Sequence, residues 1–162
     1  MITAAVLTIS DKASHGQRDD RSGDLVEKML RDAGIDVLSR RVVPDEKPLI
    51  ADSLREFSRR HDLVITTGGT GVTPRDVTPE ATKEVIQREL PGFAEVMRME
   101  GFKKTPRAII SRALAGVCNS SLIINLPGSP AGASDSLAAV LPVIPHTVEM
   151  IKGQGGDCAP PT

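Results

Sequence analysis

Residues 63–82 of this chain read LVITTGGTGVTPRDVTPEAT, and this stretch decides the fold. The apolar run Leu63-Val64-Ile65 is typical of a buried strand, and the glycines that follow let the backbone turn where the strand ends. Thr78-Pro79-Glu80 then combines a cap, a proline and an acid in the pattern of a helix start. A strand that passes through a glycine-rich loop into a helix indicates an α/β domain.

The loop of this stretch has the composition of an anion-binding site. Its glycines let successive backbone N–H groups converge on one anion, and its threonines add hydroxyl donors. These residues are Thr66, Thr67, Gly68, Gly69, Thr70, Gly71 and Thr73. Arg75 supplies a cation and Asp76 a carboxylate, which together suit polyphosphate with its magnesium. A turn in which Asp76 only caps its own backbone is an equally good interpretation of that residue.

The two commonest nucleotide motifs are absent from this loop. It lacks the Gly-Lys-Ser/Thr of a P-loop, and its glycines do not fit the GxGxxG spacing of dinucleotide-binding domains. The pattern therefore indicates a phosphate site of another kind.

Strand-like and helix-like segments alternate along the rest of the chain. Strands are predicted at 2–9, 35–43, 62–66 and 122–126. Helices are predicted at 22–33, with Ser22 as the cap, and at 49–61, 78–90, 93–100, 131–140 and 146–151. This order predicts an α/β fold of three layers, a mostly parallel sheet with helices on both faces. We expect one domain over residues 1–152 and a disordered tail over 153–162.

Further loops are expected beside the glycine-rich one, because ligands bind beyond the carboxyl ends of parallel strands. Ser10, Asp11 and Lys12 follow the first strand, Asp45 the second, and Gly128-Ser129 the fourth. Local sequence also allows an Asx turn at Asp45 and a simple helix cap at Ser129.

Composition excludes several classes of protein. The 162 residues carry a net charge of −1, and Phe57, Phe93 and Phe102 are the only aromatic residues, so neither a basic nor an aromatic nucleic-acid surface is indicated. No apolar run approaches the roughly 18 residues of a membrane span. Cys118 and Cys158 form no metal or disulfide pattern, and the start of the chain lacks the features of a signal peptide. We expect a cytoplasmic protein.

Several segments, in order along the chain, resemble the MogA/MoaB family of molybdenum cofactor biosynthesis proteins. They are Thr8–Asp11, Asp20–Gly23, Pro44-Asp45, Thr66–Thr82 and Leu126–Pro130. The resemblance implies a molybdopterin-binding α/β fold, assembled as a homotrimer. It also implies a molybdopterin adenylyltransferase, which uses Mg-ATP to attach AMP to the terminal phosphate of molybdopterin and releases pyrophosphate. Because molybdate is inserted into that product, the molybdenum insertase is an expected partner.

The resemblance assigns roles to particular residues. Asp76 and Asp45 match the family's two acids implicated in activity, and they are the candidates for holding Mg²⁺. The stretch Gly68–Gly71 and Ser129 fall where the family binds the pterin phosphate and the nucleotide. We add Lys12 and Arg75 as candidates for stabilising the developing charge.

Two other functions remain open from the sequence. A non-catalytic carrier or scaffold could bind molybdopterin in the same cradle, and a trimeric structural protein would need neither loop. A carrier would not need both acids, so the presence of Asp45 and Asp76 favours the enzyme.

Overall fold

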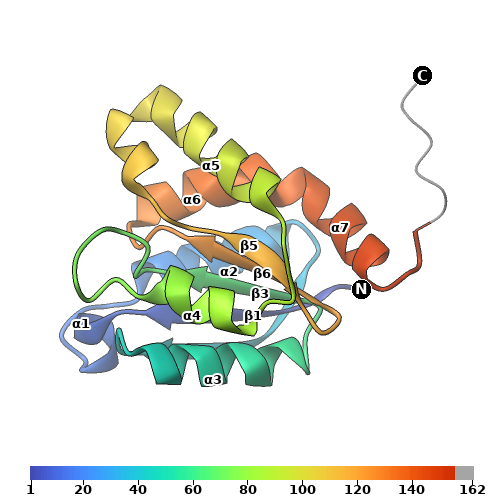
Figure 1. The fold of residues 1–162 in the computed structure, drawn as a ribbon, viewed down its shortest axis with the longest axis horizontal. Helices are drawn as coiled ribbons and strands as arrows, with labels where there is room; N and C mark the ends of the chain where they lie inside the picture. The colour runs from blue at the N-terminus through green and yellow to red at the C-terminus, as the bar shows by residue number, and fades with distance from the viewer. Residues whose placement is uncertain (156–162) are drawn as a thin grey trace.

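The computed structural model describes residues 1–155, which form one six-stranded sheet between two layers of helices (Figure 1). The strand order is β2-β1-β3-β6-β5-β4, and the first four of these strands are parallel. β5 and β4 extend the sheet antiparallel. The strands are β1 Thr3–Ile9, β2 Asp36–Val43, β3 Leu63–Thr67, β4 Arg88–Glu89, β5 Ala115–Cys118 and β6 Ser121–Leu126. The predicted mostly parallel sheet is confirmed.

Helices cover both faces of the sheet, as Figure 1 shows for α5, α6 and α7 on one side and α3 and α4 on the other. α2 packs beside α6 on the first of these faces. The helices are α1 Asp11–Ser14, α2 Arg21–Asp32, α3 Lys47–Ser58, α4 Thr78–Val85, α5 Pro91–Lys104, α6 Pro130–Val140 and α7 Ile144–Ile151, with short 3₁₀ helices η1 Pro106–Ile110 and η2 Leu141–Val143. No helix among residues 1–155 is long and apolar enough to cross a membrane.

The sheet has a separate core on each face because successive side chains of a strand point in opposite directions. In β1, Val6 packs with α2, α5, α6 and α7, whereas its neighbour Leu7 packs with α3 and α4. The same alternation separates Ile123 from Ile124 in β6. All four side chains are fully buried, so the central strands have an apolar core on each face. Packing on both faces holds these strands in place, so the loops at their ends begin at defined positions.

The prediction differs from the structure mainly between residues 78 and 118. The helix predicted over 78–90 ends at Val85, because the chain turns there into β4, which pairs with β5. β4 and β5 were not predicted, and β4 is only two exposed residues long. Pro91, expected to break a helix, instead begins α5, which runs on to Lys104.

The predicted domain boundary at residue 152 falls just after α7, which ends at Ile151. Of the predicted tail, residues 156–162, including Cys158, lie outside the described part of the chain. The extent of the domain therefore stays a prediction.

Candidate functional site

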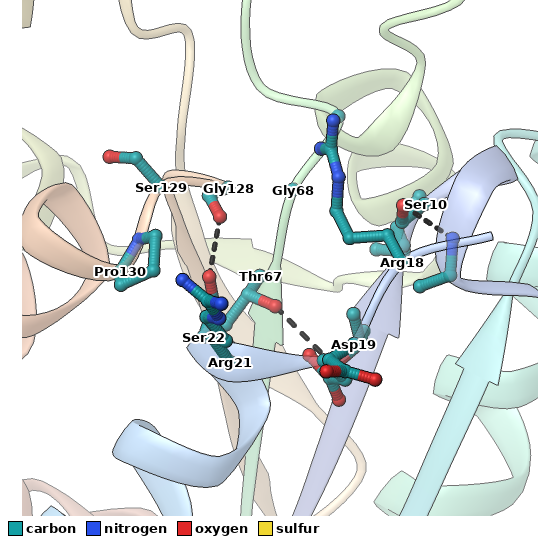
Figure 2. Close-up of a pocket in the computed structure, with 15 residues that line it drawn as sticks. Ser10, Arg18, Asp19, Arg21, Ser22, Thr67, Gly68, Gly128, Ser129 and Pro130 are labelled. Carbon is teal, nitrogen blue, oxygen red and sulfur yellow. Dashed lines mark hydrogen bonds between the residues drawn. The ribbon is translucent and has the colours of Figure 1, made fainter. Parts of the chain in front are cut away.

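The loops that follow β1, β2, β3 and β6 meet at one edge of the sheet, where two cavities open. The first, of about 790 Å³, lies between the end of β1, the start of α2 and the two glycine turns (Figure 2). The second, of about 580 Å³, lies between the glycine-rich loop, α5, η1 and the start of α6. The two share Gly69, Gly128 and Ser129 as a common wall, which we call the shared strip.

The glycine-rich loop takes a conformation that needs glycine. Gly68 and Gly69 have φ angles of 95° and 69°, in the left-handed region that L side chains disfavour. A Cβ on Gly68 would also collide with the carbonyl oxygen of Ile9. Gly128 approaches from the other turn, and a Cβ on it would lie 3.2 Å from the Cα of Gly68. The two turns therefore pack backbone against backbone and form one wall.

A buried hydrogen-bond network beneath the loop holds it in place. The Thr78 hydroxyl donates to the carbonyl of Gly68 at 2.9 Å, and the Thr82 hydroxyl donates to the carbonyl of Thr78 at 2.8 Å. The Asn125 amide of β6 donates to the hydroxyls of Thr82 and Thr66 at 2.9 and 3.0 Å. The predicted capping role of Thr78 is thus wrong: Val77 occupies the cap position of α4, and the Thr78 side chain supports Gly68 instead.

Asp11, Asp45 and Arg75 form a cluster on the rim. The Asp11 N–H donates to Asp45 Oδ2 at 2.9 Å, and the Asp45 N–H donates to Asp11 Oδ1 at 3.0 Å. Arg75 reaches across from the glycine-rich loop and donates from Nε and Nη2 to Asp11 at 3.1 and 2.9 Å. These bonds tie three predicted site residues from three loops together.

The two acids of this cluster have opposite electrostatic surroundings. The hydrogen bonds from Arg75 lower the pKa of Asp11. Burial raises the pKa of Asp45, and the negative charges of Asp11 and Asp76 raise it further. Asp45 lies close to the shared strip, because a Cβ on Gly69 would be 3.2 Å from Asp45 Oδ1. A cation at this point would relieve the repulsion that Asp45 experiences.

Asp76 caps its own turn, as one of its two interpretations required. Its Oδ2 accepts from the N–H and the hydroxyl of Thr73 at 2.9 and 2.8 Å. Asp76 and Asp45 each accept the hydrogen bonds described above at Oδ2. Among the described residues, no three His, Cys, Asp or Glu side chains are grouped as a metal site. This donor set suits a Mg²⁺ ion that takes most of its ligands from substrate phosphates and water.

Asp20 organises the first cavity. Its carboxylate accepts from the N–H of Gly23 at 2.9 Å and from the Thr8 hydroxyl at 2.7 Å, and it pairs with Arg40 at 2.6 Å. Asp20 is therefore the cap of α2, and the predicted Ser22 cap is wrong. The Ser22 hydroxyl instead donates to the carbonyl of Gly128 at 2.5 Å, as the dashed line in Figure 2 shows. This bond ties α2 to the shared strip.

The structure distributes the other predicted residues over the two cavities. Ser10, Thr67 and Gly68 line the first, Thr70, Gly71 and Asp76 line the second, and Gly69, Gly128 and Ser129 line both. Ser10 and Ser129 also cap helices, through bonds from the N–H groups of Ala13 and Gly132 at 3.1 and 3.0 Å. Lys12 is exposed and lines neither of these two cavities.

Sequence reasoning missed three arginines. Arg18 and Arg21 line the first cavity, and neither was predicted as a site residue. Figure 2 shows Arg18 across the hollow from Ser129 and Pro130. Arg112, in a stretch with no motif, bonds to the glycine-rich loop. The alternation of strands and helices locates loops, but it does not tell which of their charged side chains turn inward.

Known proteins resemble this chain in both sequence and structure. Residues 5–146 match the family model described as "Probable molybdopterin binding domain". The chain is 47% identical over 156 residues to the molybdopterin adenylyltransferase of Helicobacter pylori strain J99, covering 94% of this chain and 89% of that protein. It superimposes on the molybdopterin biosynthesis enzyme MoaB of Thermus thermophilus with a TM-score of 0.89 and 48% identity, covering 94% and 98% of the two chains. A longer relative, the molybdenum cofactor biosynthesis bifunctional protein of Synechococcus elongatus, is 35% identical over 94% of this chain and 48% of its own length.

Proposed function

Since this chain belongs to the molybdopterin-binding family of molybdenum cofactor biosynthesis proteins, we propose that its paired cavities bind molybdopterin and ATP side by side and join them. The protein is a nucleotidyltransferase of molybdenum cofactor biosynthesis: it transfers the adenylyl group of ATP to molybdopterin. The shared strip is the observation that carries the proposed mechanism. Ligands in two cavities with a common wall bring their phosphates together at that wall.

The reaction needs positioned phosphates more than a protein nucleophile. An oxygen of the terminal phosphate of molybdopterin attacks the α-phosphorus of ATP and forms the new P–O bond. The bond from the α-phosphorus to the bridging oxygen breaks, and pyrophosphate leaves with the electron pair. The shared strip joins Gly69 of the glycine-rich loop to the start of α6, and the positive end of a helix dipole at its N-terminus favours phosphate charge there.

The two rim acids are proposed to work on the nucleotide. Asp45 and Asp76 would hold the Mg²⁺ that enters with ATP, and this ion supplies neutralisation of phosphate charge. Binding the ion also offsets the repulsion that raises the pKa of Asp45. Arg75 is paired with Asp11 in this structure, so its proposed contact with phosphate requires that it exchange one anionic partner for another. Lys12 stays the second candidate for this role.

The proposed homotrimer has a candidate contact surface on α5 and η1. α5 buries Ala94 and Met97 against the sheet, yet it exposes apolar residues on its other side. We call this surface the apolar face: Val96, Met99, Phe102, Ile109 and Ile110, which are 42–66% exposed. A contiguous apolar surface of this kind favours burial against another subunit.

A partner in the pathway is proposed from the chemistry of the product. Adenylylated molybdopterin is consumed by insertion of molybdate, so we propose that the protein passes it to the molybdenum insertase. The bifunctional relative supports such a coupling, because a domain like this one fills about half of a longer chain. We place both steps in the cytoplasm, as expected from the sequence.

One experiment tests the proposed reaction against the carrier alternative. The protein is incubated with molybdopterin, ATP and Mg²⁺, and adenylylated product and pyrophosphate are measured. We expect both in equal amounts, and loss of both with Asp76→Ala. Molybdopterin binding without product in the parent protein would establish the carrier instead. Equal turnover by parent and Asp76→Ala would remove Asp76 from the mechanism while leaving the reaction in place.

A further inference from the structure

Arg112 lies between η1 and β5 and makes four hydrogen bonds, three to the glycine-rich loop and one to α4. Its side chain donates from Nε to the carbonyl of Gly71 at 2.7 Å and from Nη2 to the carbonyl of Asp76 at 2.8 Å. Its Nη1 pairs with Glu80, and its main-chain N–H donates to the carbonyl of Thr70 at 2.8 Å. One residue thus bonds to both ends of the segment 71–76.

The segment between these two ends has few other attachments. Val72 is 68% exposed, and Thr73, Pro74 and Arg75 are exposed as well. The hydrogen bonds between Asp76 and Thr73 are internal to the segment, so they fix its shape and not its position. Besides the bonds of Arg112, Arg75 reaches the rest of the molecule from within the segment, through its pair with Asp11 and a longer contact of 3.9 Å with Glu46, and both pairs lie on the exposed rim. The guanidinium of Arg112 therefore sets where the segment lies.

We infer that Arg112 is a positioning residue for adenylyl transfer, which holds the backbone of Asp76 so that its carboxylate meets the magnesium-bound phosphates. This inference rests on the proposed function. The planar guanidinium spans Gly71, Asp76 and Glu80 with separate N–H groups, and the lysine ammonium, a compact point charge, cannot reproduce that fork. Glu80 in the first turn of α4 holds the guanidinium in the plane that reaches both carbonyls.

The size of the effect follows from what a small misplacement costs. Without the clamp, the carboxylate of Asp76 samples positions away from the reacting phosphates, and a displacement of about 1 Å lowers a rate by about 10²-fold. We expect the loss to fall mainly on kcat, because a misplaced carboxylate disturbs the alignment of the reacting phosphates while the two cavities that bind the substrates are otherwise unchanged. The main-chain bond from Arg112 to Thr70 does not involve the side chain, so this attachment remains in the Arg112 variants.

The experiment compares Arg112→Lys and Arg112→Met with the control Arg55→Met. Arg55 has a similar exposed side-chain fraction, 40% against 36%, and forms salt bridges with Asp52 and Glu84, but it lies on α3 and lines neither of the two cavities of the site. Steady-state rates are measured with molybdopterin and ATP over a range of Mg²⁺ concentrations. We expect kcat to fall about 10²-fold in both Arg112 variants with KM little changed. We also expect a higher Mg²⁺ requirement in these variants and parental behaviour for Arg55→Met.

A double-mutant cycle decides whether Arg112 acts through Asp76. If it does, Arg112→Met added to Asp76→Asn lowers the rate little further, because the carboxylate to be positioned is already gone. Fully additive losses, or an Arg112→Met variant as fast as the parent, would overturn the inference. Exchange of the amide hydrogens of residues 71–77 is measured as well, and faster exchange is expected in the Arg112 variants alone. If the parent makes no product, the proposed reaction fails, and exchange then decides the clamp by itself: unchanged exchange rejects it.

Discussion

Replacing Asn125 by alanine should destabilise the protein strongly, because this side chain is the centre of the network beneath the glycine-rich loop. Asn125 is fully buried, and its amide makes three hydrogen bonds. Two donate to the hydroxyls of Thr66 and Thr82, and the third accepts from the N–H of Leu114 at 3.3 Å. Alanine removes all three hydrogen bonds at once.

The magnitude follows from the groups left behind. The N–H of Leu114 and the hydroxyl of Thr66 lose their hydrogen bond to Asn125, and each buried group left without a partner costs about 1–3 kcal/mol. The Thr82 hydroxyl keeps its bond to the carbonyl of Thr78, so its loss is smaller. We expect the free energy of unfolding to fall by about 2–5 kcal/mol, a large share of the roughly 5–15 kcal/mol of a typical domain.

Urea unfolding followed by circular dichroism measures this loss, and a double-mutant cycle with Thr66→Val tests its cause. Valine keeps the shape of Thr66 and removes the hydroxyl that Asn125→Ala would leave without a partner. The second change should therefore cost less in the Asn125→Ala background than in the parent, with a coupling of about 0.5–3 kcal/mol. The reasoning fails if Asn125→Ala costs under about 1 kcal/mol, or if the two changes are additive.

Three further predictions concern the loops and the apolar face. Asp45→Asn should raise the melting temperature at pH 7 while lowering activity. The pKa of Asp45 is raised in the folded protein, so the stability that its protonation contributes is lost as pH rises through that pKa. The gain in melting temperature from asparagine should therefore vanish in melting curves below about pH 4, where Asp45 is protonated in both states. Gly34→Ala should lower the free energy of unfolding by about 1–2 kcal/mol, because its φ of 80° is the only source of strain. Gly68→Ala adds the collision with the carbonyl of Ile9, so chemical unfolding should show a larger loss and turnover should fall. Equal losses in the two variants would contradict this. Met99→Glu should dissociate the proposed trimer in sedimentation measurements while Lys28→Glu, on exposed α2 surface, should not; an unchanged mass for Met99→Glu would place the interface elsewhere.

The sequence predicted the central sheet well because its strands are apolar and bounded by clear turns. Leu63-Val64-Ile65 and the run ending at Leu126 were located correctly, since burial on both faces leaves a continuous apolar signal. β4 was missed because two exposed residues, Arg88 and Glu89, carry no such signal. Its pairing with β5 depends on a tertiary contact that local pattern does not contain.

The candidate site was predictable where glycine and proline mark the chain and less so elsewhere. Gly68 and Gly69 do adopt the left-handed conformation that their pattern indicated. Charged residues were harder, because an arginine at a cavity and an arginine in solvent have the same local sequence. Helix starts show a further limit, because more than one residue near a start suits the cap position by its type. The contacts of Asp20 with Thr8 and of Thr78 with Gly68, which the local sequence does not show, fix the positions of these two side chains.

The shared strip has a consequence for how such a protein could be redesigned. Only Gly69, Gly128 and Ser129 line both cavities, so each cavity has an outer wall of its own. Arg18 and Arg21 belong to one outer wall, and Arg107 and Ile110 to the other. Ligand preference on either side can therefore drift, or be engineered, independently, while the point where the two ligands meet stays constant.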